Sequence, residues 1–182
     1  PVRKCANRCI FCFVDQMPRG LRKSLYVKDE DVRHSFLNGN YVTLSSARPA
    51  DLERIMRMHL SPLYVSVHAS NRQIRNAMLG SSRVPDILDQ MRVLTDGGIR
   101  LHTQIVVCPG YNDGTVLERT VQDLVGIGEN IESIAVVPVG ITRFRKCALR
   151  PVDRDSAREM CRSVNGLGDA DMRLSGRRRV FA

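Results

Sequence analysis

Three cysteines within eight residues are the feature of this sequence best suited to chemistry. Cys5, Cys9 and Cys12 follow the spacing C-x3-C-x2-C in the run CANRCIFC. Thiolates this close on one irregular loop can bind a single small metal centre. A structural zinc site normally takes four protein ligands, and the nearest histidine, His34, lies beyond a charged stretch. Three cysteines better suit an iron–sulfur cluster with one iron left open for a small molecule, since electron-transfer clusters usually have four.

The other three cysteines, Cys108, Cys147 and Cys161, are scattered along the chain. A disulfide framework requires an oxidising compartment, and the residues given contain no export signal. We therefore expect all three to be packing residues, with Cys161 on the apolar face of a helix. Because solvent-accessible thiolates and an oxygen-sensitive cluster need reducing conditions, we expect the protein to be cytoplasmic.

The composition is typical of one soluble globular domain. The chain has 182 residues, of which 43% are hydrophobic and 26% are charged. No apolar run approaches the roughly 18 residues that a membrane span requires, so we expect no membrane partner. Lys and Arg number 28 and Asp and Glu number 19, which gives a net charge of +9 and favours an anionic partner. The first five residues contain no initiator methionine, so we expect a piece of a longer protein.

Apolar runs and helical patterns alternate along the chain. We expect strands at residues 41–44, 63–68, 99–107 and 134–137, and helices at 29–37, 49–60, 73–79, 85–95, 114–126 and 153–164. This alternation predicts a parallel sheet flanked by crossover helices, either a barrel or a doubly wound α/β fold. Chemistry in such folds gathers at the carboxyl ends of the strands. No dinucleotide-binding or P-loop glycine motif follows any of these strands.

The expected strand ends carry polar residues that could line one site. Ser45 and Ser46 follow the first strand, Ser66 and His68 end the second, and Cys108 follows the third. We expect Ser45, His68 and Cys108 to point into the same cavity as the three clustered cysteines. The alternative is a purely structural role, in which the serines form hydrogen bonds with local backbone groups and the histidine is a hydrogen-bonded core residue.

Several segments of the sequence resemble one branch of the radical S-adenosylmethionine (SAM) superfamily. The cysteine spacing, with Phe11 directly before the third cysteine, is similar to that superfamily's motif. The segments are residues 5–20, 35–44, 60–70, 102–114 and 135–142, which include CANRCIFCFVDQMPRG and HTQIVVCPGYNDG. They resemble uncharacterised bacterial proteins, labelled iron–sulfur oxidoreductases, with an N-terminal PDZ-like domain and a C-terminal domain of unknown function. The resemblance implies that residues 1–182 are an incomplete radical SAM core without those two domains.

The resemblance also implies a fold and a chemistry. The fold is a partial parallel (β/α)6 barrel, truncated at its first and last strands. A 4Fe–4S cluster on Cys5, Cys9 and Cys12 would bind S-adenosylmethionine at its open iron. An electron donor such as a flavodoxin or ferredoxin would then drive cleavage of the cofactor to a 5′-deoxyadenosyl radical, which acts on an unknown substrate. The cofactors supply the chemistry, and the protein positions and shields them.

One motif of the superfamily is missing from this chain. The usual Gly-Gly-Glu after the second barrel strand holds the cofactor's amino group, and this sequence has Ser45-Ser46-Ala47 there. We expect Ser45 and Ser46 to replace the motif. Ser66 and His68, at the end of the next strand, are expected to reach the cofactor's carboxylate or ribose.

Two other classes of function stay open on the residues alone. One is a non-catalytic iron–sulfur or zinc protein, which the missing fourth cysteine disfavours. The other is an RNA-associated module, including a radical-based RNA modifier, which the positive charge keeps open. The basic runs at residues 143–146 and 177–179 contain few aromatic residues, so we interpret them as solvated faces rather than nucleic acid contacts.

Overall fold

A parallel four-stranded sheet forms the centre of the computed structural model, which describes residues 2–145 and 148–182. Its strands, in spatial order, are β1 (Leu63–Ser66), β2 (Leu101–Val107), β3 (Ile131–Pro138) and β4 (Val180–Phe181). Each strand is parallel to its neighbour. The predicted parallel α/β class is therefore confirmed. Within the described residues the sheet is open, because β1 and β4 do not pair with each other.

The strand expected at residues 41–44 is reduced to a single bridge at the outer edge of β1. Val42 pairs with Val65 in parallel, and its backbone bonds to Tyr64 and Ser66 at 2.9 and 2.8 Å. Leu44 then adopts a φ of 56°, a left-handed conformation that an extended strand does not contain. The prediction of a full strand is therefore wrong, because the chain turns away from the sheet at Leu44.

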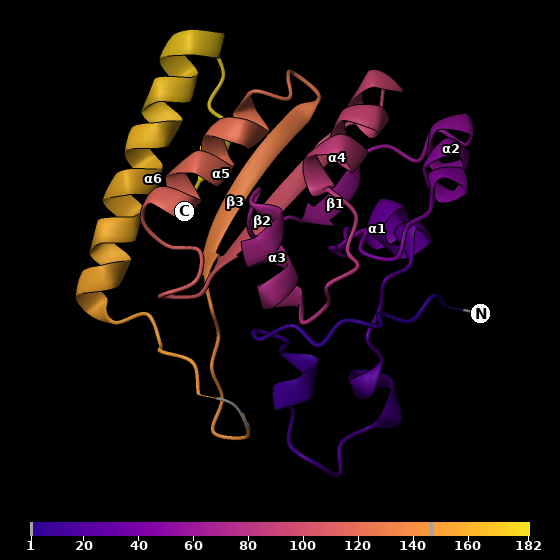
Figure 1. Cartoon of the computed structure of the whole chain (residues 1–182), viewed down its shortest axis with the longest axis vertical. Helices are drawn as coiled ribbons and strands as arrows, with labels where there is room; N and C mark the ends of the chain where they lie inside the picture. Colours follow the sequence, from indigo (N-terminus) through magenta and orange to yellow (C-terminus); the bar gives the residue numbers. More distant parts are fainter. Residues whose placement is uncertain (1, 146–147) are drawn as a thin grey trace.

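Six α-helices in the described part of the chain flank the sheet. They are α1 (Val32–Asn38), α2 (Pro49–Arg57), α3 (Arg72–Leu79), α4 (Ile87–Asp96), α5 (Thr115–Val125) and α6 (Arg154–Ser175). Side chains that accept backbone N–H groups begin four of them, namely Asp31, Asn71, Asp86 and Asp153. Figure 1 shows α3, α4 and α5 in front of the sheet, with α6 alongside α5. None of the described helices is both long and apolar enough to span a bilayer.

Helix α6 is longer than the expected 153–164. It continues through Gly166 and Gly168 to Ser175. Gly168 allows a close approach to β4, because a Cβ there would lie 2.9 Å from the Val180 carbonyl oxygen. The buried positions of α6 are Val164, Gly168 and Asp171. The helix therefore extends because its second half covers β4.

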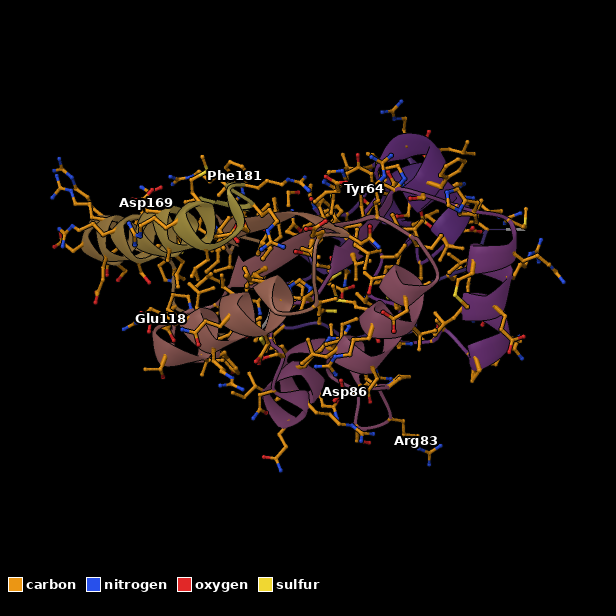
Figure 2. All side chains as sticks on the ribbon, turned by 90° about the horizontal axis from the view of Figure 1, so that it is seen from above. Tyr64, Arg83, Asp86, Glu118, Asp169 and Phe181 are labelled. Carbon is orange, nitrogen blue, oxygen red and sulfur yellow. The ribbon has the colours of Figure 1, made fainter. Side chains whose placement is uncertain are left out.

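The apolar core lies between the sheet and the helices. Strand β2 alternates strictly, with Leu101, Thr103, Ile105 and Val107 buried and the residues between them partly exposed. Leu101, Ile105 and Val107 belong to one cluster with apolar side chains of α4, α5 and α6. Figure 2 shows Tyr64 and Phe181 on the face of the sheet away from Asp86 and Glu118, which lie on the helical side. One face is thus covered by helices, and the other carries partly exposed side chains.

Candidate functional site

Residues 2–28, the cysteine segment, lie beside the carboxyl ends of the strands. Figure 1 shows this segment in indigo, below the helices and the sheet. Its regular structure consists of two 3-10 turns, η1 (Val14–Gln16) and η2 (Lys23–Tyr26). Its ends are joined, since the Cys5 N–H donates to the Lys28 carbonyl at 2.9 Å. The segment forms an irregular loop at the edge of the sheet where parallel α/β folds carry their sites.

Helix α3 anchors the middle of the cysteine segment. The N–H groups of Arg8 and Ile10, on either side of the second cysteine, donate to the carbonyls of Leu79 and Met78 at 3.0 and 2.9 Å. These carbonyls belong to the last turn of α3, which has no partners for them within the helix. Gly80 ends α3 with a φ of 63°, and a Cβ there would lie 2.6 Å from the Arg8 carbonyl oxygen. Only glycine allows this approach.

Gln16 fastens the segment to the chain that follows β3. Its buried side-chain amide donates to the Gly140 carbonyl at 3.2 Å and accepts the Thr142 N–H at 3.0 Å. The Thr142 hydroxyl in turn donates to the Gln16 carbonyl at 2.8 Å. Sequence reasoning missed Gln16, because a loop glutamine is ordinarily solvated and no motif marks it.

A cavity of about 590 Å³ lies at this junction. Cys5, Cys9 and Cys12 all line it, as do Ser66 and His68 at the end of β1. The later parts of β2 and β3 and the residues after β3 complete the wall, with Gln104, Val106, Pro138 and Gly140. The structure thus brings five of the predicted site residues to one cavity.

Ser45 and Ser46 do not line that cavity, contrary to the expectation for Ser45. The Ser45 hydroxyl accepts a hydrogen bond from the Asn7 side chain at 2.8 Å and lies 2.9 Å from the Thr43 hydroxyl. Ser46 is exposed, and its carbonyl accepts from the Arg3 side chain at 2.7 Å. The turn after residue 44 directs both serines away, and Asn7 lines the cavity in their place. No spacing in the sequence singles out Asn7.

The remaining cysteines have different surroundings. Cys108 is buried, as expected of a packing residue, in a cluster with Met78 and Val139 against which Phe11 packs. It does not line the cavity, so the expectation that it would is wrong. Cys161 is exposed, not packed, because the buried stripe of α6 begins at Val164. Cys147 lies outside the described residues.

Burial makes two of the clustered thiols, those of Cys5 and Cys9, weaker acids on their own. Burial, and then the charges of the neighbouring Cys5 and Cys12, raise the pKa of Cys9 to about 12. Burial also raises the pKa of Cys5. The three thiols therefore form one electrostatic group. A bound metal centre would stabilise their thiolates, because a coordinating thiol is deprotonated.

The donor set fits an iron–sulfur cluster better than a single ion. In the described chain, no group of three or more His, Cys, Asp or Glu side chains converges on one metal ion. A cubane cluster makes a different demand, because each thiolate binds a different iron and the ligands surround a shared space. Three thiols that line one cavity suit such a cluster in their chemistry.

His68 is locked into the wall of the cavity. Its Nδ1 accepts the Val106 N–H at 3.2 Å, and its ring lies against Phe11 with centroids 4.2 Å apart. The buried Asn112 side chain donates to the His68 carbonyl at 2.7 Å and accepts the Cys108 N–H at 2.8 Å. Asn112 therefore links the chain that follows β1 to the chain that follows β2.

Two buried side chains of opposite charge, Arg75 and Glu30, also bond to the chain near the cysteine segment. The Arg75 guanidinium donates to the carbonyls of Val67 at 3.0 Å and Thr43 at 2.6 Å. The Glu30 carboxylate accepts the Thr43 N–H at 2.9 Å and its hydroxyl at 2.8 Å. Burial raises the pKa of Glu30 and lowers that of Arg75 to about 10. Sequence reasoning missed both residues, because neither lies in a motif or at a strand end.

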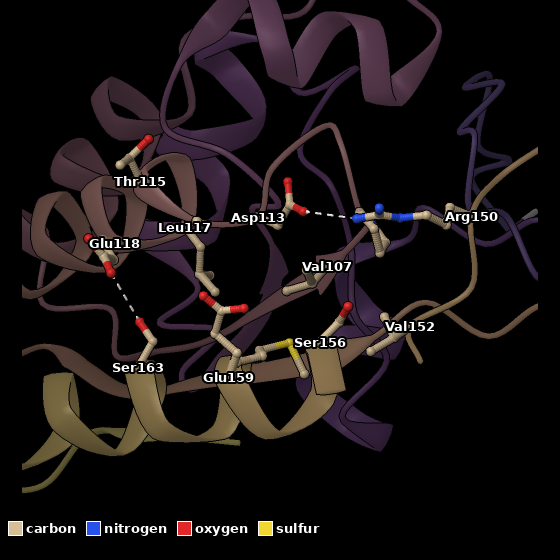
Figure 3. Close-up of a pocket in the computed structure, with 13 residues that line it drawn as sticks. Val107, Asp113, Thr115, Leu117, Glu118, Arg150, Val152, Ser156, Glu159 and Ser163 are labelled. Atoms are coloured by element: carbon tan, nitrogen blue, oxygen red, sulfur yellow. Dashed lines mark hydrogen bonds and ion pairs between the residues drawn. The ribbon is translucent and has the colours of Figure 1, made fainter. Parts of the chain in front are cut away.

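A second cavity, of about 390 Å³, contains different chemistry. It lies between the end of β2 and the first turns of α5 and α6 (Figure 3). Glu118 accepts the Ser163 hydroxyl at 3.2 Å, and Asp113 pairs with Arg150 at 3.9 Å. Glu159 lines the same space. This cavity holds carboxylates and no cysteine or histidine, so it adds nothing to the thiol site.

The basic run 177–179 forms ion pairs within the chain. Arg177 pairs with Glu132 at 2.9 Å and Arg178 with Asp169 at 2.5 Å. Arg179 is buried and pairs with Asp171 at 2.5 Å. The interpretation as a fully solvated face is therefore wrong for Arg179. Of the other run, residue 146 lies outside the described residues.

Comparisons with known proteins agree with this architecture. A family model described as "Radical SAM-like domain" matches residues 1–134, which include all three clustered cysteines. A domain of pyruvate-formate lyase-activating enzyme from Bacteroides vulgatus ATCC 8482 is similar in structure, with a TM-score of 0.53 and 14% identity over 70% of this chain and 76% of that chain. This likeness shows the fold alone.

A radical SAM methyltransferase from Sphaerobacter thermophilus gives a TM-score of 0.46 and 17% identity, over 64% of this chain and 36% of that one. No curated protein sequence matches this chain. Because the family model covers well over half of the chain and contains its cysteine motif, the chain belongs to the radical SAM-like domain family.

Proposed function

We propose that the chain is the core of a radical SAM enzyme, which binds a 4Fe–4S cluster through Cys5, Cys9 and Cys12. The observation that carries this proposal is the single cavity lined by these cysteines and by the ends of β1, β2 and β3. Its volume of about 590 Å³ suits a ligand of the size of S-adenosylmethionine, because small-molecule sites span roughly 300–1,000 Å³. When bound, the cluster would supply the electron that cleaves S-adenosylmethionine to a 5′-deoxyadenosyl radical.

The chain's own residues would hold the cofactor and keep water out. Phe11 lines the cavity and packs against His68 and the Cys108 cluster, so it would help to exclude water there. Ser66 and His68 line the wall and are the proposed contacts to the cofactor. We assign Ser45 an indirect role, since it holds Asn7, which lines the cavity. Ser46 is exposed, bonds to the Arg3 side chain and does not line the cavity, so we assign it no contact to the cofactor.

The proposal includes a wider setting. The four strands and the Val42 bridge would form part of a (β/α)6 barrel, and residues 1–182 would be its incomplete core beside PDZ-like and C-terminal domains. A flavodoxin or ferredoxin would deliver the electron. Since the cysteines of the described chain are free thiols, a reducing cytoplasm is the matching compartment. The substrate and its reaction are left unassigned.

Anaerobic turnover tests the proposal directly. The full-length protein is reconstituted with iron and sulfide, reduced with dithionite and incubated with S-adenosylmethionine, and 5′-deoxyadenosine is measured by chromatography. We expect the product from the wild type and none from the Cys5→Ala, Cys9→Ala, Cys12→Ala triple variant. A wild-type protein that assembles a cluster but neither binds nor cleaves the cofactor would instead be a non-catalytic iron–sulfur protein.

A further inference from the structure

A buried guanidinium lies behind the wall of the cysteine cavity. Arg75 is 1% exposed and does not itself line the cavity. It donates to the carbonyls of Val67 at 3.0 Å and Thr43 at 2.6 Å. Val67 directly precedes His68, and the Thr43 hydroxyl accepts the Asn7 side chain at 3.0 Å. Because His68 and Asn7 both line the cavity, each acceptor of Arg75 is adjacent to a residue of the wall.

Helix α3 places this guanidinium on the side of the cavity that carries Cys9. Arg75, Met78 and Leu79 are the buried residues of α3, and this spacing puts them on one face of the helix. The carbonyls of Met78 and Leu79 accept the two N–H groups on either side of Cys9, at 2.9 and 3.0 Å. Arg75 therefore lies one helical turn from the anchor that holds Cys9.

No carboxylate forms a hydrogen bond with Arg75 in the described structure. Its two bonds go to uncharged carbonyls, and its Nη1 has no partner among the described residues. Burial lowers the pKa of Arg75 to about 10, while the charges of Glu30 and Cys9 act in the opposite direction. The guanidinium therefore stays protonated at neutral pH. A buried charge is costly unless opposite charge lies nearby.

The Glu30 carboxylate places the opposite charge near the same thiol. It is 4% exposed and accepts the N–H and hydroxyl of Thr43, whose carbonyl accepts from Arg75. Burial raises the pKa of Glu30, whereas the hydrogen bonds from Thr43 favour the ionised form. Burial is the main cause of the raised pKa of Cys9, and Glu30 also contributes. Glu30 and Arg75 thus act on Cys9 with opposite sign.

Fixed charges beside an iron–sulfur cluster set its reduction potential. Reduction adds one negative charge to the cluster. A nearby cation stabilises the reduced state and raises the potential, and a nearby anion lowers it. Charges buried in the protein are screened by water and salt much less than exposed ones. Such a charge acts through its field, so it needs no contact with the cluster.

We infer that the Arg75 guanidinium raises the reduction potential of the cluster bound at Cys9, and that the Glu30 carboxylate lowers it. The inference rests on the cluster of the proposed function. Both are positioning residues, which act from behind the wall and touch neither substrate nor cofactor. Together they set how readily an electron donor reduces the cluster.

Matched substitutions separate the charges from the structural roles of these side chains. Arg75→Gln removes the charge and keeps an amide donor, whereas Arg75→Lys keeps the charge. Glu30→Gln removes the negative charge and keeps an oxygen that can accept from Thr43. Arg72 lies on the same helix and is exposed. Arg72→Gln therefore makes the same change of charge where water screens it.

The potential is measured by redox titration of the reconstituted full-length protein, followed by electron paramagnetic resonance without S-adenosylmethionine. At a fixed potential, Arg75→Gln should lower the ratio of reduced to oxidised cluster about tenfold, a shift of about 59 mV for one electron. Arg75→Lys should shift it much less. Glu30→Gln should raise the potential, and the double variant Arg75→Gln, Glu30→Gln should lie near the wild type. Arg72→Gln should match the wild type, with the same iron content in all variants.

Several outcomes would overturn the inference. Equal potentials of the wild type and Arg75→Gln would do so, as would an equal fall in Arg75→Lys, because charge would then not be the cause. A lowered potential in Glu30→Gln would indicate a general disturbance of the site, and an unchanged one would remove the part assigned to Glu30. If Arg75→Gln does not fold, the double variant compared with Glu30→Gln gives the effect of Arg75. All these results leave the proposed function intact, whereas a wild type that assembles no cluster would remove both proposals.

Discussion

The cysteine segment and the parallel sheet are held in place by different forces. The sheet and its helices bury a continuous set of apolar side chains, among them Leu63, Leu101 and Ile131. In residues 2–28, by contrast, the buried side chains are those of Asn7 and Gln16, and no apolar side chain is buried. Apolar burial stabilises the sheet at about 25 cal/mol per Å² without any ligand. The segment depends on a few directional hydrogen bonds and on the partly buried Ile10 and Phe11.

This difference indicates which region is stable without a bound cluster. The sheet and its helices, called the scaffold here, bury enough apolar surface to be so, whereas the cysteine segment does not. The scaffold can form before a cluster is bound, and it presents the ends of β1, β2 and β3. The segment is attached to the scaffold at the end of α3, through Gln16 to Gly140, and through Asn7 to Thr43 and Ser45. Its opening is therefore expected to cost less free energy than global unfolding. Metal binding would add stability mainly to the segment.

Removing the clustered thiols is expected to have the largest effect. Cys5→Ala, Cys9→Ala and Cys12→Ala should each abolish bound iron and sulfide, since each would remove the protein ligand of one iron. Anaerobic reconstitution followed by iron and sulfide assays measures this. The controls Cys108→Ala, Cys147→Ala and Cys161→Ala should retain the cluster. Loss of the cluster in any control would contradict the assignment of three ligands.

A core substitution tests whether the sheet is stable without the segment's ligand. Ile105→Ala should lower the free energy of unfolding by about 2–5 kcal/mol, because it leaves a cavity among buried side chains. Phe13, in the cysteine segment, is 75% exposed, so Phe13→Ala should change the free energy by less than about 0.5 kcal/mol. Urea denaturation of iron-free protein gives both values. Similar losses of unfolding free energy in the two variants would show that the segment and the sheet contribute equally to the stability of the iron-free protein.

Gly80→Ala tests the anchor on α3. Gly80 and Gly176 both end helices with positive φ, at 63° and 72°, but only Gly80 faces the Arg8 carbonyl. Both alanine variants should lose about 1–2 kcal/mol from the left-handed backbone. Gly80→Ala alone should also raise hydrogen exchange of the Arg8 and Ile10 amides, about tenfold. Equal exchange at these amides in both variants would show that the anchor is dispensable.

The smallest expected effect comes from protonating Asp31, where the segment meets α1. Its carboxylate accepts the N–H groups of Arg3, at 3.0 Å, and Arg33, at 3.1 Å. Hydrogen bonds from the Arg33 side chain are the largest cause of a pKa held well below the ordinary aspartate value. A lowered pKa in the folded state stabilises the fold above the unfolded pKa of about 4 and loses this contribution as pH falls below it.

Wild-type stability should therefore fall more steeply between about pH 5 and pH 2 than that of Asp31→Asn. Urea denaturation across this range measures the difference. Asp89→Asn is the control, because Asp89 is exposed and lies on α4, away from the segment. If Asp31→Asn and the wild type lose stability in parallel, Asp31 does not link the segment to α1.

Local patterns in the sequence determined the fold class and singled out the three clustered cysteines as the proposed metal ligands. The strands expected at 63–68 and 99–107 match Leu63–Ser66 and Leu101–Val107 within two residues, because the apolar period of a strand is carried by neighbouring positions. The cysteine spacing and the family resemblance need only adjacent residues as well. Both could therefore be predicted without knowing which parts of the chain meet.

The tertiary structure alone decided which side chains line the site. Gln16 meets Thr142, Arg75 meets Thr43, and the ring of His68 meets Val106, and each contact joins positions far apart in the sequence. Ser45 and His68 look alike as polar residues at strand ends, yet a positive φ at Leu44 turns one away while Asn112 holds the other in the wall. Such outcomes depend on hydrogen bonds across the fold, which no local spacing records.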